Sequence, residues 1–513
     1  MDIIKTLALK INKKYALLFI TGLWCAALQS SLELPLPAFV SYAPLMYFLS
    51  RFESRRDLAK SFASFFIPYY FYQFAFLLTV YPQIDLVRPL AVLLLLLAVI
   101  ALTLWESLLM LLAVYLYTYL RKDRIYDLLT LAVLIAAGEW LQESFPVLSF
   151  PWCGVWLSVT GEPLVIQPAN LLGCRVVTVL LLTVNGFAAY ALTACGKKRL
   201  AAVCSAAAVY VLWFGYGFYS AWHAEKLSQD SESIIAVVAQ DEAEGNKKTA
   251  CTAWDCARAY RRIINSSMIE KADIVVLPET AVPMGYDSAA GEFSVVSGIA
   301  KSCKATVING CFFRFDGDEY NALYAVDCEG NVSEPYFKQV LVPFGEKIPF
   351  AALFGSSTLC ECSDDVHTKP LETALGKVGC AICIESVYAE TVRKQAADGA
   401  QILCVCTNDS WFGKSSARNV HFRHSIMRAA ENGKYLLRSG NCGISAIIKP
   451  TGEVQSVRTQ TSKGVVTGEV RLIEERTLYS RFKDLFTIFP AALAALAVIK
   501  MYKLSPKNNE KLI

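Results

Sequence analysis

The sequence has little charge for its length. Only 18% of its 513 residues are Asp, Glu, Lys or Arg, and the formal net charge is +4. It has no dense basic stretch with interleaved aromatic side chains, which a nucleic-acid groove would need. We therefore expect no nucleic-acid partner.

The sequence is rich in hydrophobic residues. They make up 55% of the chain, more than in an average globular protein, so much of the chain is expected to lie in lipid. Apolar runs of about 17 to 25 residues are long enough to cross a bilayer as helices. Eight runs are candidate spans, and they are 15–32, 35–50, 61–81, 89–119, 126–145, 175–195, 200–220 and 485–502.

Alternate connections between these runs have almost no Lys or Arg. The connections 81–88 and 146–172 are of this kind, whereas the other connections are basic and include Lys60, Arg121 and Lys198. Short basic loops stay in the cytoplasm. The pattern therefore predicts a cytoplasmic N-terminus and a polytopic α-helical membrane protein.

This topology predicts three parts. Residues 1–220 form a membrane domain with seven transmembrane helices, residues 221–483 form an exported domain, and residues 484–513 form the last transmembrane helix and a cytoplasmic tail. A signal peptide is the alternative interpretation of residues 1–32, which combine a basic start, an apolar run and the segment CAALQS. We prefer an uncleaved first span, because the next apolar run follows at once.

The exported domain differs in composition from the spans. Short β-rich runs such as ADIVVLPE, KVGCAICIE and AQILCVCTND alternate with polar helical segments, which indicates an α/β or α+β sheet domain. Polar residues just beyond apolar strands commonly meet ligands in such domains. Glu279, Lys338 and Cys383 hold such positions. Taken alone, Glu279 is more typical of a helix cap or turn, and Lys338 of a surface lysine.

Two cysteines lie three residues apart in the run KVGCAICIE. In a regular strand Cys380 and Cys383 would point to opposite faces, so only one would reach a site. Cys383 is favoured, because it ends the run beside Glu385, where a bend would expose it. A thiol of ordinary pKa needs a base or a positive neighbour. The chain has only four histidines, none close to Cys383 in sequence, so the groups at the other strand ends are the better candidates.

Four motifs occur in the order of a known superfamily. LPETAVP, KQVLVPFGEKIPF, GCAICIES and TNDSWFG resemble the carbon–nitrogen hydrolase (nitrilase-like) superfamily, most strongly from Pro278 to Ser445. The spans, together with SFPW at Ser149–Trp152, resemble the apolipoprotein N-acyltransferase family, which completes bacterial lipoprotein maturation. The resemblance implies a nitrilase-like four-layer α-β-β-α sandwich for the exported domain. It also implies a bacterial inner (cytoplasmic) membrane protein with its catalytic domain on the periplasmic side.

The resemblance further implies a Glu–Lys–Cys triad and a ping-pong acyl transfer. Glu279 would take the thiol proton, Cys383 would form a thioester with an acyl chain from a membrane phospholipid, and Lys338 would stabilise the oxyanion. The acceptor would be the N-terminal amine of a diacylglyceryl-cysteine lipoprotein. Glu346 and Glu385 would orient Lys338 or the nucleophile loop, and turn or surface acids are an equally weighted interpretation of both. The scheme requires no metal or cofactor.

Other functions remain open at this point. A membrane-tethered amidase acting on a soluble amide would keep the triad, but one span would be enough to tether it. A transporter would be expected to show repeats among its spans, and the sequence shows none. A scaffold would not need the three triad residues together.

Two further expectations concern particular segments. Glu106 and Glu139 lie within spans, where acids are costly, and so should face the bundle interior, a helix partner or water. Residues 350–370 are rich in Gly, Ser and Asp and have no clear periodicity, so we expect a mobile lid there.

Overall fold

The chain divides into two compact units in the structure, which is a computed structural model. The first unit is Met1–Pro168, Leu172–Gly217 and Asp484–Ile513, and the second is Ala169–Leu171 and Phe218–Lys483. The structure describes residues 13–32, 34–83, 86–122, 125–145, 148–242, 253–266, 272–282, 293–315, 317–342, 346, 367–482 and 485–503. Most of the expected lid, residues 350–366, lies outside the described residues. The three-part domain division expected from the sequence stays a prediction.

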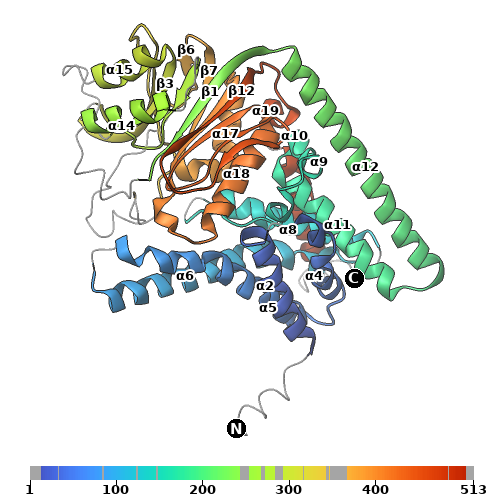
Figure 1. The fold of residues 1–513 in the computed structure, drawn as a ribbon. Helices are drawn as coiled ribbons and strands as arrows, with labels where there is room; N and C mark the ends of the chain where they lie inside the picture. The colour runs from blue at the N-terminus through green and yellow to red at the C-terminus, as the bar shows by residue number, and fades with distance from the viewer. Residues whose placement is uncertain are drawn as a thin grey trace. The chain divides into compact units, whose positions relative to one another are not determined.

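The described part of the first unit is helical (Figure 1). Its α-helices are α2 (Lys13–Ser30), α3 (Pro35–Ser41), α4 (Ala43–Ser50), α5 (Arg55–Phe74), α6 (Arg88–Tyr115), α7 (Tyr117–Leu120), α8 (Asp127–Ser144), α9 (Pro163–Ile166), α11 (Cys174–Thr193) and α20 (Ile488–Lys503). Three 3₁₀ helices accompany them, namely η1 (Ala75–Gln83), η2 (Val155–Val159) and η5 (Leu485–Thr487). Two helices have residues in both units, namely α10 (Ala169–Leu172) and α12 (Gly196–Gln229).

Four helices of the described chain are long and apolar enough to cross a membrane. They are Arg55–Pro82, Arg88–Leu120, Cys174–Thr193 and Gly196–Gln229. These helices overlap the expected spans 61–81, 89–119, 175–195 and 200–220. They support a membrane protein, whereas the count of eight spans is not confirmed.

The other four expected spans are not among these four helices, for physical reasons. Residues 35–50 form two short helices, α3 and α4, which meet near Pro44. Helix α2 begins with two lysines, and α8 contains three acids, which lowers the apolar content of both. The last apolar helix, Leu485–Ala497, is short for a span.

Small residues allow the helices of the first unit to pack closely. A Cβ atom added to Gly22 of α2 would lie 2.3 Å from the backbone oxygen of Phe65 in α5. A Cβ added to Gly138 of α8 would lie 2.3 Å from the sulfur of Met110 in α6. Close backbone approach at small residues is typical of helices that pack in membranes.

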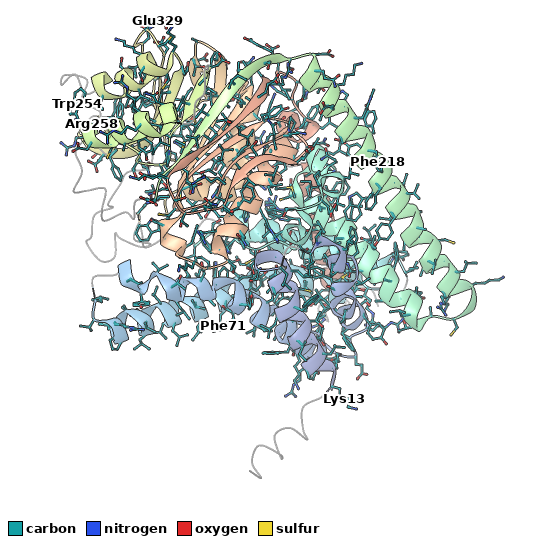
Figure 2. The ribbon with its side chains drawn as sticks, in the orientation of Figure 1. Lys13, Phe71, Phe218, Trp254, Arg258 and Glu329 are labelled. Carbon is teal, nitrogen blue, oxygen red and sulfur yellow. The ribbon has the colours of Figure 1, made fainter. Side chains whose placement is uncertain are left out.

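The first unit buries some polar side chains and exposes some large apolar ones. Glu106 and Glu139 are buried, as expected, and Glu139 accepts hydrogen bonds from the Val155 N–H at 2.7 Å and the Thr178 hydroxyl at 2.9 Å. Phe71, by contrast, is exposed on α5 (Figure 2). This arrangement suits a helical bundle whose outer surface faces lipid.

The described residues of the second unit form two six-stranded sheets. The strand order of the first sheet is β12-β1-β2-β3-β4-β5 and that of the second is β11-β10-β9-β8-β7-β6. The strands of the first sheet are β1 (Glu232–Gln240), β2 (Ile274–Val276), β3 (Thr306–Phe315), β4 (Asp318–Val326), β5 (Tyr336–Phe337) and β12 (Gly464–Leu472). Those of the second are β6 (Leu371–Thr373), β7 (Gly376–Ile382), β8 (Ile402–Asn408), β9 (Leu436–Asn441), β10 (Ser445–Ile448) and β11 (Val454–Arg458).

Helices cover the outer faces of both sheets (Figure 1). They are α14 (Ala253–Ser266) and α15 (Phe293–Cys303) on the first sheet, and α17 (Ala389–Ala397) and α18 (Ala417–Asn432) on the second. The short helices η3 (Cys383–Val387), η4 (Asp409–Phe412) and α19 (Leu478–Phe482) complete the unit. Trp254 and Arg258 lie on the exposed face of α14 (Figure 2).

Strand β1 shows how the layers are built from the sequence. Ile234, Ala236 and Val238 pack between the two sheets, whereas Val237 and Ala239 pack with the buried residues of α14 and α15. Successive side chains of a strand point to opposite faces, so an apolar run can be buried on both sides. The second unit therefore has the four-layer α-β-β-α arrangement expected from the sequence.

Candidate active site

Cys383 lies in a strained turn at the end of β7. Its φ angle is 53°, a left-handed conformation that is uncommon for any residue other than glycine. Strand β7 pairs in parallel with β8, and Ile382 faces Cys406 in the register. Cys383 therefore lies beside Thr407, whose hydroxyl is one of the groups that lower the pKa of the thiol.

The regular alternation considered for the two cysteines does not extend to Cys383, which lies in a bend as the sequence indicated. Cys380 and Cys383 belong to the same buried cluster between the sheets, because the strand ends at Ile382 and the backbone then turns. Regular alternation applies only within the strand. Cys380 is 1% exposed within the strand, whereas Cys383 follows it and is 9% exposed.

Glu279 lies just beyond β2, as the sequence indicated. A Cβ atom on Gly310 of β3 would lie 2.8 Å from the Thr280 nitrogen, so a glycine is needed for this close approach. The Glu279 carboxylate is buried and accepts hydrogen bonds at 2.8 Å from the Asn321 side-chain amide and from the Asn408 backbone N–H. Both of its oxygens are thus held by fixed donors.

Lys338 lies just beyond β5 and is buried. Its Nζ atom is 2.8 Å from Glu346 Oε1 and 3.3 Å from Glu279 Oε1. Its backbone N–H donates to the Asn321 carbonyl at 2.8 Å, so Asn321 holds both Lys338 and Glu279. Burial alone would lower the pKa of Lys338, but the two carboxylates raise it well above its usual value. Lys338 is therefore an ammonium group at neutral pH.

The Cys383 thiol interacts electrostatically with both of these groups. Burial and the charge of Glu279 raise its pKa, while Lys338 and the Thr407 hydroxyl lower it by less. The resting thiol is therefore protonated at neutral pH, and nucleophilic attack needs a group that accepts its proton.

Glu385 connects the lysine segment to the cysteine turn. One carboxylate oxygen accepts from the Gln339 N–H and, at 3.1 Å, from the Val340 N–H. The other accepts from the Ile382 N–H at 2.7 Å and from the Tyr336 hydroxyl at 3.0 Å. Burial raises the pKa of Glu385 to about 7, although these donors oppose the shift.

Neither Glu385 nor Glu346 is a surface acid. Glu385 is fully buried, and Glu346 is partly buried, with one oxygen on Lys338 and the other accepting from the Val342 N–H at 2.8 Å. The structure therefore brings together all five residues expected at the site.

Several polar residues of the site were missed by sequence reasoning. Asn321 lies in the middle of β4, where nothing in the local sequence marks it. Asp409 is part of the TNDSWFG motif, and His421 lies on α18, where its Nε2 atom contacts the Cys383 carbonyl oxygen at 3.0 Å rather than the thiol. Among the described residues, no group of three or more His, Cys, Asp or Glu is placed to hold a metal ion.

Two protein families match the two parts of this chain. The carbon–nitrogen hydrolase family matches residues 234–478, and the apolipoprotein N-acyltransferase N-terminal domain matches residues 21–187. The apolipoprotein N-acyltransferase of Gloeobacter violaceus is 30% identical over 380 residues, which are 72% of this chain and 71% of that protein. The chain belongs to the apolipoprotein N-acyltransferase family.

Further members of the apolipoprotein N-acyltransferase family show similar agreement. The Geobacter metallireducens protein is 32% identical over 44% of this chain and 45% of its own length. The Vibrio vulnificus protein is 28% identical over 72% of this chain and 74% of its own length. A solved carbon–nitrogen hydrolase from Helicobacter pylori covers 50% of this chain and 94% of its own, with a TM-score of 0.38 and 17% identity.

Proposed function

We propose that this protein transfers an acyl chain from a membrane phospholipid to the N-terminal amine of a diacylglyceryl-cysteine lipoprotein, through a thioester on Cys383. The observation that carries the proposal is the buried Glu279–Lys338 pair, which interacts with the Cys383 thiol in a chain of this family. Apolar helices long enough to cross a membrane suit a lipid donor.

Glu279 is the general base of the first half-reaction. It takes the thiol proton while the sulfur attacks the ester carbonyl carbon of the phospholipid. The Lys338 ammonium stabilises the negative oxygen of the tetrahedral intermediate, a contribution whose loss typically costs about 10²–10³ in rate. The C–O bond then breaks, the lysophospholipid oxygen receives the proton from Glu279, and the acyl group remains on sulfur.

The second half-reaction reverses these proton movements. The lipoprotein amine attacks the thioester carbon, and Glu279 accepts a proton from the amine nitrogen. The C–S bond breaks, the amide product leaves, and the proton returns to the Cys383 sulfur. One carboxylate thus serves both steps, which the low exposure of Glu279 favours because bulk water does not compete for the proton.

Glu346 stabilises the charge of Lys338 when Glu279 is protonated. The ammonium has two carboxylate neighbours, and proton transfer to Glu279 removes the charge of one of them. Glu346 Oε1 remains 2.8 Å from Lys338 Nζ and offsets the desolvation cost of the buried ammonium. Glu385 keeps the segment after Lys338 in register with the cysteine turn.

The proposal includes the location of the protein. Alternation of basic connections supports eight spans in the bacterial inner membrane, with the catalytic unit on the periplasmic side. The match of residues 21–187 to the acyltransferase N-terminal domain disfavours the alternative, a membrane-tethered amidase acting on a soluble amide.

The test is turnover by the purified full-length protein in detergent. We expect a triacylated product when phospholipid and a diacylated lipopeptide with a free N-terminal amine are both present. A matched control is Cys380→Ala, which should retain turnover because it removes only a buried neighbouring thiol. Hydrolysis of a soluble amide without transfer to the lipopeptide would contradict the proposal and favour the amidase.

A further inference from the structure

A buried polar network lies next to the turn that carries Cys383. Its members come from the end of β8, from η4, from α18 and from β9, and all are fully buried. They are Thr407, Asp409, His421, Ser425 and Arg438. The proposed acyl transfer uses none of them as acid, base or nucleophile.

Asp409 is the centre of this network. One of its oxygens lies 2.8 Å from both the Thr407 hydroxyl and His421 Nδ1, and the other accepts from Arg438 at 2.8 Å. A Cβ atom on Gly443 would lie 2.2 Å from this carboxylate, so the position after β9 that approaches Asp409 must be a glycine. Burial would raise the pKa of Asp409, but Arg438 and His421 hold it well below its usual range.

The other nitrogen of His421 reaches the backbone of the nucleophile. His421 Nε2 lies 3.0 Å from the Cys383 carbonyl oxygen and 3.0 Å from the Ser386 hydroxyl. Ser386 itself donates to the same carbonyl at 2.9 Å. A carbonyl oxygen only accepts, so a hydrogen bond from the ring to the Cys383 carbonyl uses a proton on Nε2. Nδ1 lies 2.8 Å from Asp409 and 3.0 Å from Arg438, and these two contacts fix the orientation of the ring.

The backbone of Cys383 needs such support. A left-handed conformation at a residue other than glycine is unfavourable and persists only where the surroundings determine it. The residue before Cys383 is held by Glu385 through the Ile382 N–H, and the carbonyl of Cys383 is held by His421 and Ser386.

We propose that His421 and Ser386 are positioning residues, which hold the Cys383 carbonyl and so keep the thiol aimed at the reacting carbonyl carbon, with His421 itself oriented by Asp409 and Arg438. The effect of these residues on acyl transfer rests on the proposed function, whereas their effect on the position and reactivity of the thiol does not. Releasing the carbonyl lets the turn relax and moves the sulfur away from Lys338 and Glu279.

The test compares His421→Gln with His421→Asn in the full-length protein. The Gln amide nitrogen can replace Nε2 and still donate to the Cys383 carbonyl, whereas the shorter Asn amide can replace only Nδ1. Both variants exchange a ring for an amide, so each is the matched control for the other. The readout is the rate of Cys383 alkylation by iodoacetamide, localised by fragmentation of the tryptic peptide 378–393.

We expect His421→Asn to slow alkylation by about tenfold or more, because small displacements of a reacting atom have large effects, and His421→Gln to stay within about threefold of wild type. Equal rates in the two folded variants would overturn the proposal. If neither variant folds, Ser386→Ala replaces them. Slowing by about threefold or more would then support the proposal, and a wild-type rate would overturn it.

Acyl-enzyme formation with phospholipid is measured on the same samples. If wild type forms no acyl-enzyme but the two His421 variants still differ in alkylation, the proposed function fails and the positioning role stands. If wild type forms the acyl-enzyme and the variants do not differ in alkylation, only the positioning role fails.

Discussion

Glu279→Gln should make the Cys383 thiol easier to ionise and yet stop acyl transfer. The carboxylate is one of the two main causes of the raised thiol pKa, and Lys338, which opposes it, remains after the substitution. A nearby charge typically shifts a pKa by about one to three units, so we expect the thiol pKa to fall by at least about one unit. The variant then separates thiol ionisation from proton transfer.

The expected rates follow from this shift. A fall of about one unit raises the thiolate fraction about tenfold at a fixed pH below the thiol pKa, while the lower basicity weakens the thiolate about threefold as a nucleophile. Alkylation by iodoacetamide should therefore become about threefold faster. Formation of the acyl-enzyme should become about 10²–10⁴-fold slower, because the group that receives and returns the proton is gone.

Both rates are measured by mass spectrometry on the peptide 378–393 across pH 6–9. Glu390→Gln is the matched control, because Glu390 is more exposed and pairs with Arg393 instead. It should change neither rate. Slower alkylation in folded Glu279→Gln, or acylation at the wild-type rate, would refute the assignment of Glu279 as the base.

Three further changes have defined outcomes. Thr407→Val removes a hydroxyl that lowers the thiol pKa, so alkylation of Cys383 should shift to higher pH, and an unchanged profile would contradict this effect. Glu385 has a folded pKa of about 7 against an ordinary 4.5, so its stabilising effect is complete below pH 4.5 and is lost as the pH rises through 7. At about 1.4 kcal/mol per unit the loss is about 3 kcal/mol, and thermal unfolding of Glu385→Gln should lack this fall. In a cysteine-depleted chain, a cysteine at Asp230 should react with an impermeant reagent from outside and one at Lys60 only after the inner face is opened, whereas the reverse pattern would overturn the topology.

The strands of the second unit were largely predictable, because burial of a strand depends on its own side chains. The runs ADIVVLPE and AQILCVCTND contain β2 and β8, and KVGCAICIE covers all of β7 except its first residue. Strands β5, β6, β9, β11 and β12 were missed. In β9, Arg438 and Asn441 interrupt the apolar pattern. Arg438 is nevertheless fully buried, because Asp409 neutralises it from the neighbouring strand end. Such partners are distant in sequence and leave no local pattern.

Five residues of the site could be predicted, whereas Asn321, Asp409 and His421 and the geometry of the site could not. Positions just beyond apolar runs indicated Glu279, Lys338 and Cys383 separately, and the family resemblance joined them. The left-handed turn at Cys383 was not predictable, because Glu385, Ser386 and distant side chains impose it.

The acidic helix α8 shows the same limit in the first unit. It overlaps the expected span 126–145, which is not confirmed; its three acids lower its apolar content, although Glu139 accepts hydrogen bonds from η2 and α11. Local hydropathy measures the cost of placing each side chain in lipid. It does not include the hydrogen-bond partners that other helices supply.

The central claim is that the acyl group rests on Cys383 between donor and acceptor. The most direct measurement is mass spectrometry of the full-length protein after mixing with phospholipid alone, followed by addition of a diacylated lipopeptide. We predict an acyl adduct on Cys383 within the peptide 378–393, lost on addition of the lipopeptide, and no adduct in Cys383→Ala. An adduct on Cys380, or N-acylated product from Cys383→Ala, would contradict the account.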